Sequence, residues 1–250
     1  MYNHPDISIC MVFYNAEPYI REAIDSALKQ SFENFEFVIV DDGSTDGSRD
    51  IVKSYTDTRI KYFKNKHDYI DSLNKAYSSA TGKYNVKMDS DDKMHEDRLL
   101  VLFNFMEGNP DIAACGTGFE RFGASTDRYI PPVIESDEIE QALSNDNCFA
   151  FPIIRRSFLV DNNITFKEGY ISAEDYRMWA DIVIAGGKLA NLRQVLYYYR
   201  IHNKQITSTR YEHTTRILEE IKGSIRDYLQ SKRPDKPRVV NINLNKLESL

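Results

Sequence analysis

Four short apolar runs alternate with amphipathic segments over the first 106 residues of the chain. The first run, residues 7–13, is nearly continuous in apolar residues, as expected of a strand buried on both faces, residues 35–40 predict a second buried strand, and residues 59–63 and 83–88 predict two further strands. Apolar residues at helical spacing predict helices over residues 18–28, 46–55, 71–79 and 98–106. This order predicts an α/β fold with a mostly parallel, right-handed, doubly wound sheet.

The second half of the chain, from about Gly116, lacks this clean alternation. Its clearest patterns are a helix over residues 174–185, a segment rich in tyrosine and β-branched residues over 192–201, and a helix over 214–229. We expect one sheet-based domain over residues 1–208, with halves at 1–115 and 116–208, followed by a C-terminal helix and tail over 209–250.

Composition excludes several classes of protein. The chain has 32 basic and 38 acidic residues, a net charge of −6, which argues against binding nucleic acid through its phosphates. Mean hydropathy is −0.51, no apolar run approaches the roughly eighteen residues of a membrane span, and the first residues do not resemble a signal peptide. The three cysteines (Cys10, Cys115 and Cys148) lack a paired spacing and are expected to be reduced, buried thiols of a cytoplasmic protein.

Polar clusters follow three of the predicted strands. Tyr14, Asn15 and Glu17 come after the first, Asp41 and Asp42 after the second, and residues 89–92 (Asp-Ser-Asp-Asp) after the fourth. Ligands of open parallel sheets bind outside the carboxyl ends of the strands. We therefore expect the three clusters to converge on one edge of the sheet.

Residues 89–92 place three carboxylates within four positions. Asp89 and Asp91 can share one ligand on an extended segment, and such hard oxygen donors suit Mg²⁺ or Mn²⁺. The alternative is a helix cap before Arg98. An EF-hand fails because Met94 and Leu100 occupy its glycine and terminal glutamate positions. A dinucleotide-binding glycine fingerprint fails because Arg121 stands where its third glycine belongs. For residues 41–46, the alternatives are a tight turn or a carboxylate that accepts hydrogen bonds from a ribose or a base.

Glu174 and Asp175 open a predicted helix, where carboxylates favour the positive end of the helix dipole. One interpretation is that these acids cap the helix. The other is that they include a general base, because the chain offers no Ser-His-Asp or Cys-His arrangement. His202 is interpreted either as a surface histidine or as a metal ligand. Trp179, one helical turn after Asp175, is expected either to pack in the core or to stack on a sugar.

Longer strings resemble the family 2 glycosyltransferases in collinear order over about residues 7–207. They are VFYNAEPYI, SALKQSFENFEFVIVDDGSTDGS, LNKAYSSATGKYNVKMDSDD, NPDIAACGT, FAFPIIRRS, ISAEDYRMW and LYYYRIHNKQIT. The resemblance implies the GT-A fold and a nucleotide-sugar donor, most often a UDP-sugar. It also implies single displacement with inversion at the sugar.

The same resemblance implies roles for particular residues. It implies that the residues around the nucleotide are Tyr14, Glu17, Asp42 and Asp89. The resemblance places the divalent metal, Mn²⁺ or Mg²⁺, on Asp91, with Asp92 and His202 assisting. It makes Asp175 the catalytic base, and we assign Glu174 and Trp179 to the acceptor side. A metal on the diphosphate would stabilise the leaving group where its negative charge develops.

The chain departs from the family pattern in one loop. Lys66, Asp68 and Ile70 stand where relatives often carry an Asn-x-Gly-x-Ser stretch, which puts the usual nucleotide contacts there in question. Phe151 replaces a frequent histidine before Pro152. These changes affect specificity more than the core machinery.

The sequence therefore predicts a metal-dependent inverting glycosyltransferase. It would move a hexose or N-acetylhexosamine to a glycan or lipid-linked acceptor in surface polysaccharide biosynthesis. The expected location is the cytoplasm, at the inner face of the cell membrane for a lipid-linked acceptor, since the basic tail beyond Lys232 is compatible with peripheral contact. The alternatives are a sugar-nucleotidyltransferase and a non-catalytic protein of the same fold that binds sugar nucleotides.

Overall fold

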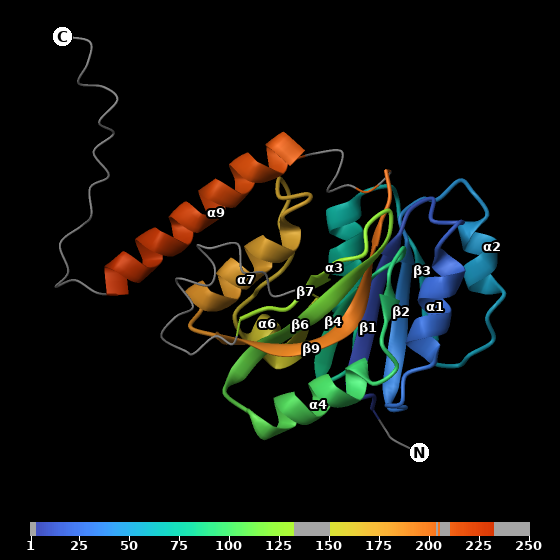
Figure 1. The fold of residues 1–250 in the computed structure, drawn as a ribbon, viewed down its shortest axis with the longest axis horizontal. Helices are drawn as coiled ribbons and strands as arrows, with labels where there is room; N and C mark the ends of the chain where they lie inside the picture. The colour runs from blue at the N-terminus through green and yellow to red at the C-terminus, as the bar shows by residue number, and fades with distance from the viewer. Residues whose placement is uncertain (1–3, 133–150, 204, 206–210, 233–250) are drawn as a thin grey trace, which may run out of the picture.

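A nine-stranded sheet forms the centre of the part of the chain that the computed structural model describes, residues 4–132, 151–203, 205 and 211–232 (Figure 1). Its strand order is β3-β2-β1-β4-β8-β6-β9-β5, with β7 paired to β6. The strands span Ile7–Phe13 (β1), Phe35–Asp41 (β2), Ile60–Lys64 (β3), Tyr84–Asp89 (β4), Lys93–Met94 (β5), Ile112–Gly123 (β6), Arg128–Tyr129 (β7), Ile153–Arg155 (β8) and Lys188–Ile201 (β9).

The first half of the sheet is parallel, as the sequence predicts. β1 lies between β2 and β4, and every residue of β1 and β2 is buried, which explains their nearly continuous apolar sequences. Phe13 is level with Asp41 on β2, and Val12 is level with Asp89 on β4. The carboxyl ends of these three strands therefore lie side by side at one edge.

Helices cover both faces of the sheet, so the molecule has three layers (Figure 1). They span Ile20–Leu28 (α1), Ser48–Lys53 (α2), Tyr69–Ser79 (α3), Arg98–Gly108 (α4), Arg156–Asp161 (α6), Glu174–Ile184 (α7) and Tyr211–Lys232 (α9). One core cluster packs α1, α2 and α4 against the sheet, and the other packs α3, α6, α7 and α9 against the opposite face.

Apolar spacing explains how these helices attach to the sheet. The α1 helix buries Ile20, Ala23, Ile24 and Ala27, which recur every three or four residues on one face. The α9 helix packs against α7 through isoleucines at 217, 221 and 225, all of which join the second core cluster. The described part of the predicted C-terminal segment thus shares a core with residues 1–208.

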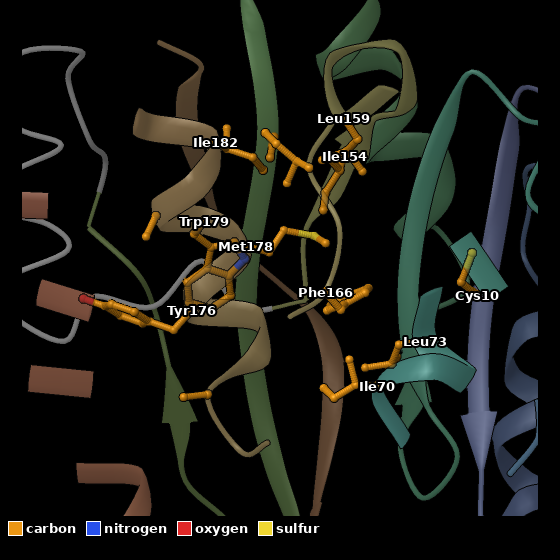
Figure 2. Packing of buried hydrophobic residues seen from close by; sticks show 14 of the residues in the cluster. Cys10, Ile70, Leu73, Ile154, Leu159, Phe166, Tyr176, Met178, Trp179 and Ile182 are labelled. Atoms are coloured by element: carbon orange, nitrogen blue, oxygen red, sulfur yellow. The ribbon is translucent and has the colours of Figure 1, made fainter. Parts of the chain in front are cut away.

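Figure 2 shows the core beneath α7, on the same face as α3. Met178 and Trp179 of α7 lie in one apolar cluster with Leu73 of α3 and Cys10 of β1. Phe166, from the segment between α6 and α7, belongs to the same cluster. This packing fixes the first turn of α7, which carries Glu174 and Asp175, relative to the sheet.

The second half of the sheet is where the sequence-based prediction was incomplete. Alternation was expected to fade at Gly116, yet β6 continues through it to Gly123 and pairs with β9 in parallel and with β8 antiparallel. Gly118 obscures the strand pattern for a physical reason: a Cβ there would meet the Tyr129 carbonyl oxygen at 2.9 Å. The close approach of β7 requires glycine within the strand.

Cys10 and Cys115 are buried free thiols, as predicted. Burial raises the pKa of both, to about 12 for Cys115, so neither is activated as a nucleophile. Cys148, the acidic stretch at 135–140 and the basic tail beyond Lys232 lie outside the described residues. None of the described helices combines the length and apolar content needed to cross a bilayer.

Candidate functional site

The three polar clusters meet at the carboxyl edge of β1, β2 and β4, as expected from the register of these strands. The loop after β1 carries Tyr14 and Glu17, that after β2 carries Asp42, and the turn after β4 carries Asp91. Two further groups arrive from the second half of the chain, at the start of α7 and just after β9. This edge is the candidate functional site.

An exposed aromatic platform lies over the end of β2. The rings of Tyr14 and His67 stack with centroids 4.0 Å apart, and Tyr14 is 46% exposed. Asp42 lies beneath and is buried: its carboxylate accepts hydrogen bonds from the Asp68 amide at 2.8 Å and the Ser72 hydroxyl at 2.6 Å. The Nδ1 atom of His67 lies 3.0 Å from the same carboxylate. Asp42 therefore holds the platform in place from below.

The loop that departs from the family pattern is organised around this carboxylate. Asp68 is the N-cap of α3, and its side chain accepts a hydrogen bond from the Asp71 amide at 3.0 Å. Ile70 is buried in the core, while Lys66 is exposed. The Asp68 charge thus serves the start of α3, and its backbone amide contacts Asp42.

Glu17 joins the loops that follow β1 and β2. Its carboxylate accepts a hydrogen bond from the Gly47 amide at 2.9 Å, and its own amide donates to Asp46 at 3.1 Å. A Cβ on Gly47 would lie 2.6 Å from the Glu17 carboxylate. Asn15 adds a third link by accepting a hydrogen bond from the Thr45 amide at 2.8 Å.

The acidic turn after β4 meets the end of β9. The Nε2 atom of His202 lies 2.8 Å from Oδ2 of Asp91, although 111 residues separate them in the sequence. Asp92 is fully buried, with Oδ1 accepting a hydrogen bond from the Arg200 amide at 2.8 Å. Burial, reinforced by the nearby charges of Asp91 and Asp89, raises the pKa of Asp92 well above its usual value.

The ligand atoms of Asp91 and His202 fit a divalent cation. Carboxylate and imidazole together suit Mn²⁺, and carboxylate oxygen also suits Mg²⁺. Oδ2 of Asp92 is buried without a hydrogen-bond partner among the described residues. Those residues bring no third histidine, cysteine or acid into a ready-made cluster, so oxygens of a bound substrate would have to complete the coordination.

A buried lysine lies in the middle of the site, and the sequence analysis did not single it out. Nζ of Lys87 is 2.6 Å from Oδ2 of Asp175, 3.2 Å from Oε1 of Glu174 and 3.5 Å from Oδ1 of Asp89. The Tyr69 hydroxyl donates to the same Glu174 oxygen at 3.1 Å. The first turn of α7 is thus attached to β4 through an ammonium group.

This cluster shifts the titration of its members. Burial raises the pKa of Asp175 to about 6; Lys87 opposes that shift, and the charges of Glu174 and Asp89 add to it. Burial alone would lower the pKa of Lys87, but the surrounding carboxylates outweigh burial and hold it well above its usual value. Lys87 therefore stays charged, while Asp175 titrates close to neutral pH.

A sequence signal for Lys87 was present. It stands in an apolar strand, two residues before Asp89 and therefore on the same face of β4. A lysine is almost never fully buried unless it is paired, so a charged residue in that run predicts acidic partners. Which acids they are could not be predicted, because α7 lies nearly ninety residues further along the chain.

The two residues assigned to the acceptor side lie differently from each other. Trp179 is 6% exposed and packs in the core beside Tyr176, with ring centroids 5.6 Å apart (Figure 2). Of the two expectations for Trp179, the structure has core packing. In this conformation the indole offers little surface on which a sugar could stack. Glu174 is also buried, but it faces Lys87 and the strand edge.

A separate cavity of about 600 Å³ lies between α3 and α6. Asn85, Arg156 and Phe166 are among its lining residues, and none of the residues predicted to form the functional site lines it. The candidate site is thus the strand edge itself.

The chain matches the family model described as Glycosyl transferase family 2 over residues 8–162, more than half of its length. It is 33% identical over 229 residues to an uncharacterized glycosyltransferase of Haemophilus influenzae, covering 85% of this chain and 70% of the relative. It is 30% identical over 224 residues to the Escherichia coli UDP-Glc:alpha-D-GlcNAc-diphosphoundecaprenol beta-1,3-glucosyltransferase WfaP, covering 87% of this chain and 86% of the relative.

The structure of S. aureus TarS 1-349 in complex with UDP-GlcNAc has a similar fold. The TM-score is 0.73 at 21% sequence identity, with 90% of this chain and 71% of that chain covered. The predicted GT-A fold is thereby confirmed. With the family model and the relatives in agreement, the chain belongs to glycosyl transferase family 2.

Proposed function

We propose that this family 2 glycosyltransferase transfers a hexose or N-acetylhexosamine from a UDP-sugar to a hydroxyl of a glycan or lipid-linked acceptor, with inversion at the sugar. The observation that carries the proposal is the position of Asp175, which lies beside Asp89 at the strand edge with its side chain 32% exposed. WfaP is named for a UDP-glucose donor and an undecaprenol-linked acceptor, and TarS is described with UDP-GlcNAc bound. The undecaprenol-linked acceptor of WfaP supports a lipid-linked acceptor, and we propose surface polysaccharide biosynthesis at the inner face of the cell membrane as the setting.

The donor nucleotide is proposed to occupy the aromatic platform. Tyr14 presents an exposed ring on which a base can stack, and Asp42 holds His67 and the loop before α3 in place. Glu17 fixes the loops on either side of the platform. Asp89 lies at the end of β4, beside the strand that leads to Tyr14, and is proposed to contact the ribose.

Asp91 and His202 would hold the divalent metal, with Asp92 beside them. When bound, Mn²⁺ or Mg²⁺ supplies positive charge to the donor diphosphate and orients it. The chain's own residues must then bring the acceptor to the sugar and remove its proton.

Asp175 is proposed to be the general base. Its ionised carboxylate accepts the proton of the acceptor hydroxyl as that oxygen forms a bond to the anomeric carbon. The bond from that carbon to the diphosphate breaks, and its electron pair leaves with the nucleotide. No second carboxylate acts as a nucleophile, so a single displacement inverts the anomeric configuration.

The proposal is tested by measuring UDP release from a panel of UDP-sugars with oligosaccharide acceptors and Mn²⁺. Wild-type protein should release UDP from at least one donor. Asp175→Asn should lower that rate by about 10²–10⁴-fold, the usual contribution of a general base, while UDP affinity measured by calorimetry stays the same. Asp111→Asn, which removes an exposed carboxylate paired with Lys188 outside the site, is the matched control and should keep the wild-type rate. Equal rates in Asp175→Asn and wild type would remove the base assignment.

A further inference from the structure

Lys87 is a buried cation in contact with three carboxylates at the strand edge. Its side chain is 6% exposed, and its three carboxylate partners are Asp89 on the same strand and Glu174 and Asp175 on α7. Burying an ammonium group is costly unless it is paired and its three N–H donors have acceptors, but a single carboxylate among those acceptors would suffice to balance its charge. Three partners leave an excess of negative charge, which a purely structural ion pair does not need.

The geometry gives Lys87 unequal contacts with these partners. The shortest is to Oδ2 of Asp175 at 2.6 Å, while the other oxygen of Asp175 accepts no hydrogen bond from the residues that the structure describes. Lys87 belongs to β4, a strand held on both sides by β1 and β8. One oxygen of the base is therefore held by a rigid element, which leaves the second oxygen for an incoming hydroxyl.

We propose that Lys87 is a positioning residue for the transfer reaction: it fixes Oδ2 of Asp175 so that Oδ1 faces the acceptor hydroxyl, and it ties the base to Asp89 on the donor side. This inference rests on the proposed function, in which Asp175 is the base. Precise placement of a base matters because a displacement of about 1 Å can cost about a hundredfold in rate.

The excess of carboxylates follows from this role. When Asp175 takes the proton of the acceptor hydroxyl, it loses its charge and its attraction to Lys87 weakens. Glu174 and Asp89 stay in contact with Lys87, so the ammonium keeps acidic partners that hold it in place through the transfer. Lys87 neither gives nor takes a proton, and Asp175 alone changes its charge.

The titratable groups that face this cluster come from four elements. Asp89 belongs to β4, Glu174 and Asp175 to α7, and the hydroxyls of Tyr69 and Tyr77 to α3. On β1, the neutral thiol of Cys10 is the register partner of Lys87. Lys87 lowers the pKa of Asp175 and Glu174 raises it, so removing each should move the titration of Asp175 in opposite directions.

The experiment measures the pH at which Asp175 titrates, by carboxyl ¹³C NMR of aspartate-labelled protein, with its signal assigned from Asp175→Asn. Wild type should titrate near pH 6. Lys87→Met removes the ammonium but keeps the chain length, and should move the midpoint to higher pH. Glu174→Gln keeps an oxygen that accepts from Lys87 and Tyr69, and should move it to lower pH.

Kinetics on the same proteins separate positioning from donor binding. Lys87→Met should lower kcat about a hundredfold with little change in the KM of the UDP-sugar, and the acid limb of its pH profile should follow the NMR midpoint. Lys87→Arg should restore the midpoint because it restores the charge. Lys83→Met is the matched control: this lysine pairs with Glu107 outside the site and should change neither quantity.

Several results would overturn the inference. They are an unchanged midpoint in Lys87→Met, shifts of the same sign in Lys87→Met and Glu174→Gln, or a raised donor KM with kcat intact. If Lys87→Met fails to fold, an unchanged or raised midpoint in Glu174→Gln overturns it instead. A wild-type protein that transfers no sugar would refute the proposed function, whereas the NMR midpoints would still report whether Lys87 governs Asp175.

Discussion

Asp175 presents one carboxylate oxygen to Lys87 and keeps the other free of donors among the described residues, in a site that raises its pKa to about 6. Three different effects meet at this residue. Burial and the neighbouring acids favour the protonated form, and the ammonium favours the ionised form. The balance gives a carboxylate that is ionised at neutral pH yet basic enough to accept a proton.

The first prediction concerns the pH dependence of transfer. The rate should fall as pH drops through about 6, because protonated Asp175 cannot accept the proton of the acceptor hydroxyl. The measurement is kcat/KM for UDP release between pH 5 and pH 8 at constant ionic strength. A profile that stays flat down to pH 5 would contradict the assignment.

The second prediction concerns stability. Because the folded-state pKa of Asp175 lies above its usual 3.8, the folded protein binds this proton more tightly than the unfolded chain does. Ionised Asp175 therefore lowers stability, and its effect grows as pH rises from about 4 through 6. Asp175→Asn should melt at a higher temperature than wild type at pH 7.5, and the difference should narrow at pH 5.

Asp181, on the same helix, is the control for that comparison. Its carboxylate pairs with Lys167 at 2.8 Å and Arg177 at 2.8 Å, so it has opposite charges as partners and no excess of acids. Asp181→Asn should lower the melting temperature at pH 7.5. If both variants were destabilised alike, ionised Asp175 would not lower the stability of the folded protein.

At the scale of elements, the site depends on β1, β2 and β4 ending together. The sheet is anchored at its other end, where Gly82 precedes β4 and its amide donates to the Ser8 hydroxyl of β1 at 2.8 Å. Ser8 in turn donates to Glu36 of β2 at 2.5 Å. This buried network aligns the three strands, and with them the residues at their carboxyl ends.

Gly82→Ala tests that anchoring. The new Cβ would lie 2.7 Å from the Ser8 backbone nitrogen, so the strand ends must shift, and we expect a loss of about 1–3 kcal/mol in the free energy of unfolding. Urea unfolding measures it. Gly108→Ala is the control, since nothing lies within 4 Å of a Cβ there, and it should be neutral or slightly stabilising. Equal stability of the two variants would contradict the account.

The elements differ in how well their sequences predicted them. β1, β2 and β4 were predicted within a residue or two. β1 and β2 are buried on both faces and leave nearly continuous apolar runs, whereas β4 mixes apolar residues with Asn85 and Lys87. β8 has only three residues and β6 carries glycines for close packing, so neither shows a strand period. At the site, short-range motifs marked Asp91 and Asp175, but the partnership of Lys87 with α7 depends on tertiary packing that no local pattern contains.

At the scale of the whole molecule, the chain carries a net charge of −6 and is proposed to bind an anionic donor. The strand edge gathers acids, including Asp89, Asp91 and Asp175, which would repel a diphosphate. A divalent cation between protein and donor reverses that local sign. We therefore predict that the donor binds together with a divalent metal.

Metal removal tests this at the level of binding. UDP affinity, measured by calorimetry, should rise by at least tenfold on adding Mn²⁺ and return to its metal-free value with a chelator. Asp91→Ala should lose the gain, because it removes the carboxylate that meets His202. Asp127→Ala, which removes an exposed acid paired with Arg121, should keep the gain in UDP affinity. Metal-independent UDP binding would contradict the assignment.

The most direct test of the central claim is the anomeric configuration of the product. Proton NMR of the glycoside formed from an α-linked UDP-sugar reads it without assumptions about the site. In the proposed mechanism no carboxylate attacks the anomeric carbon and Asp175 acts only as the base, so the transfer is a single displacement, and the account predicts a β-linked sugar. An α-linked product would contradict it, as would the absence of transfer from every UDP-sugar in the presence of Mn²⁺.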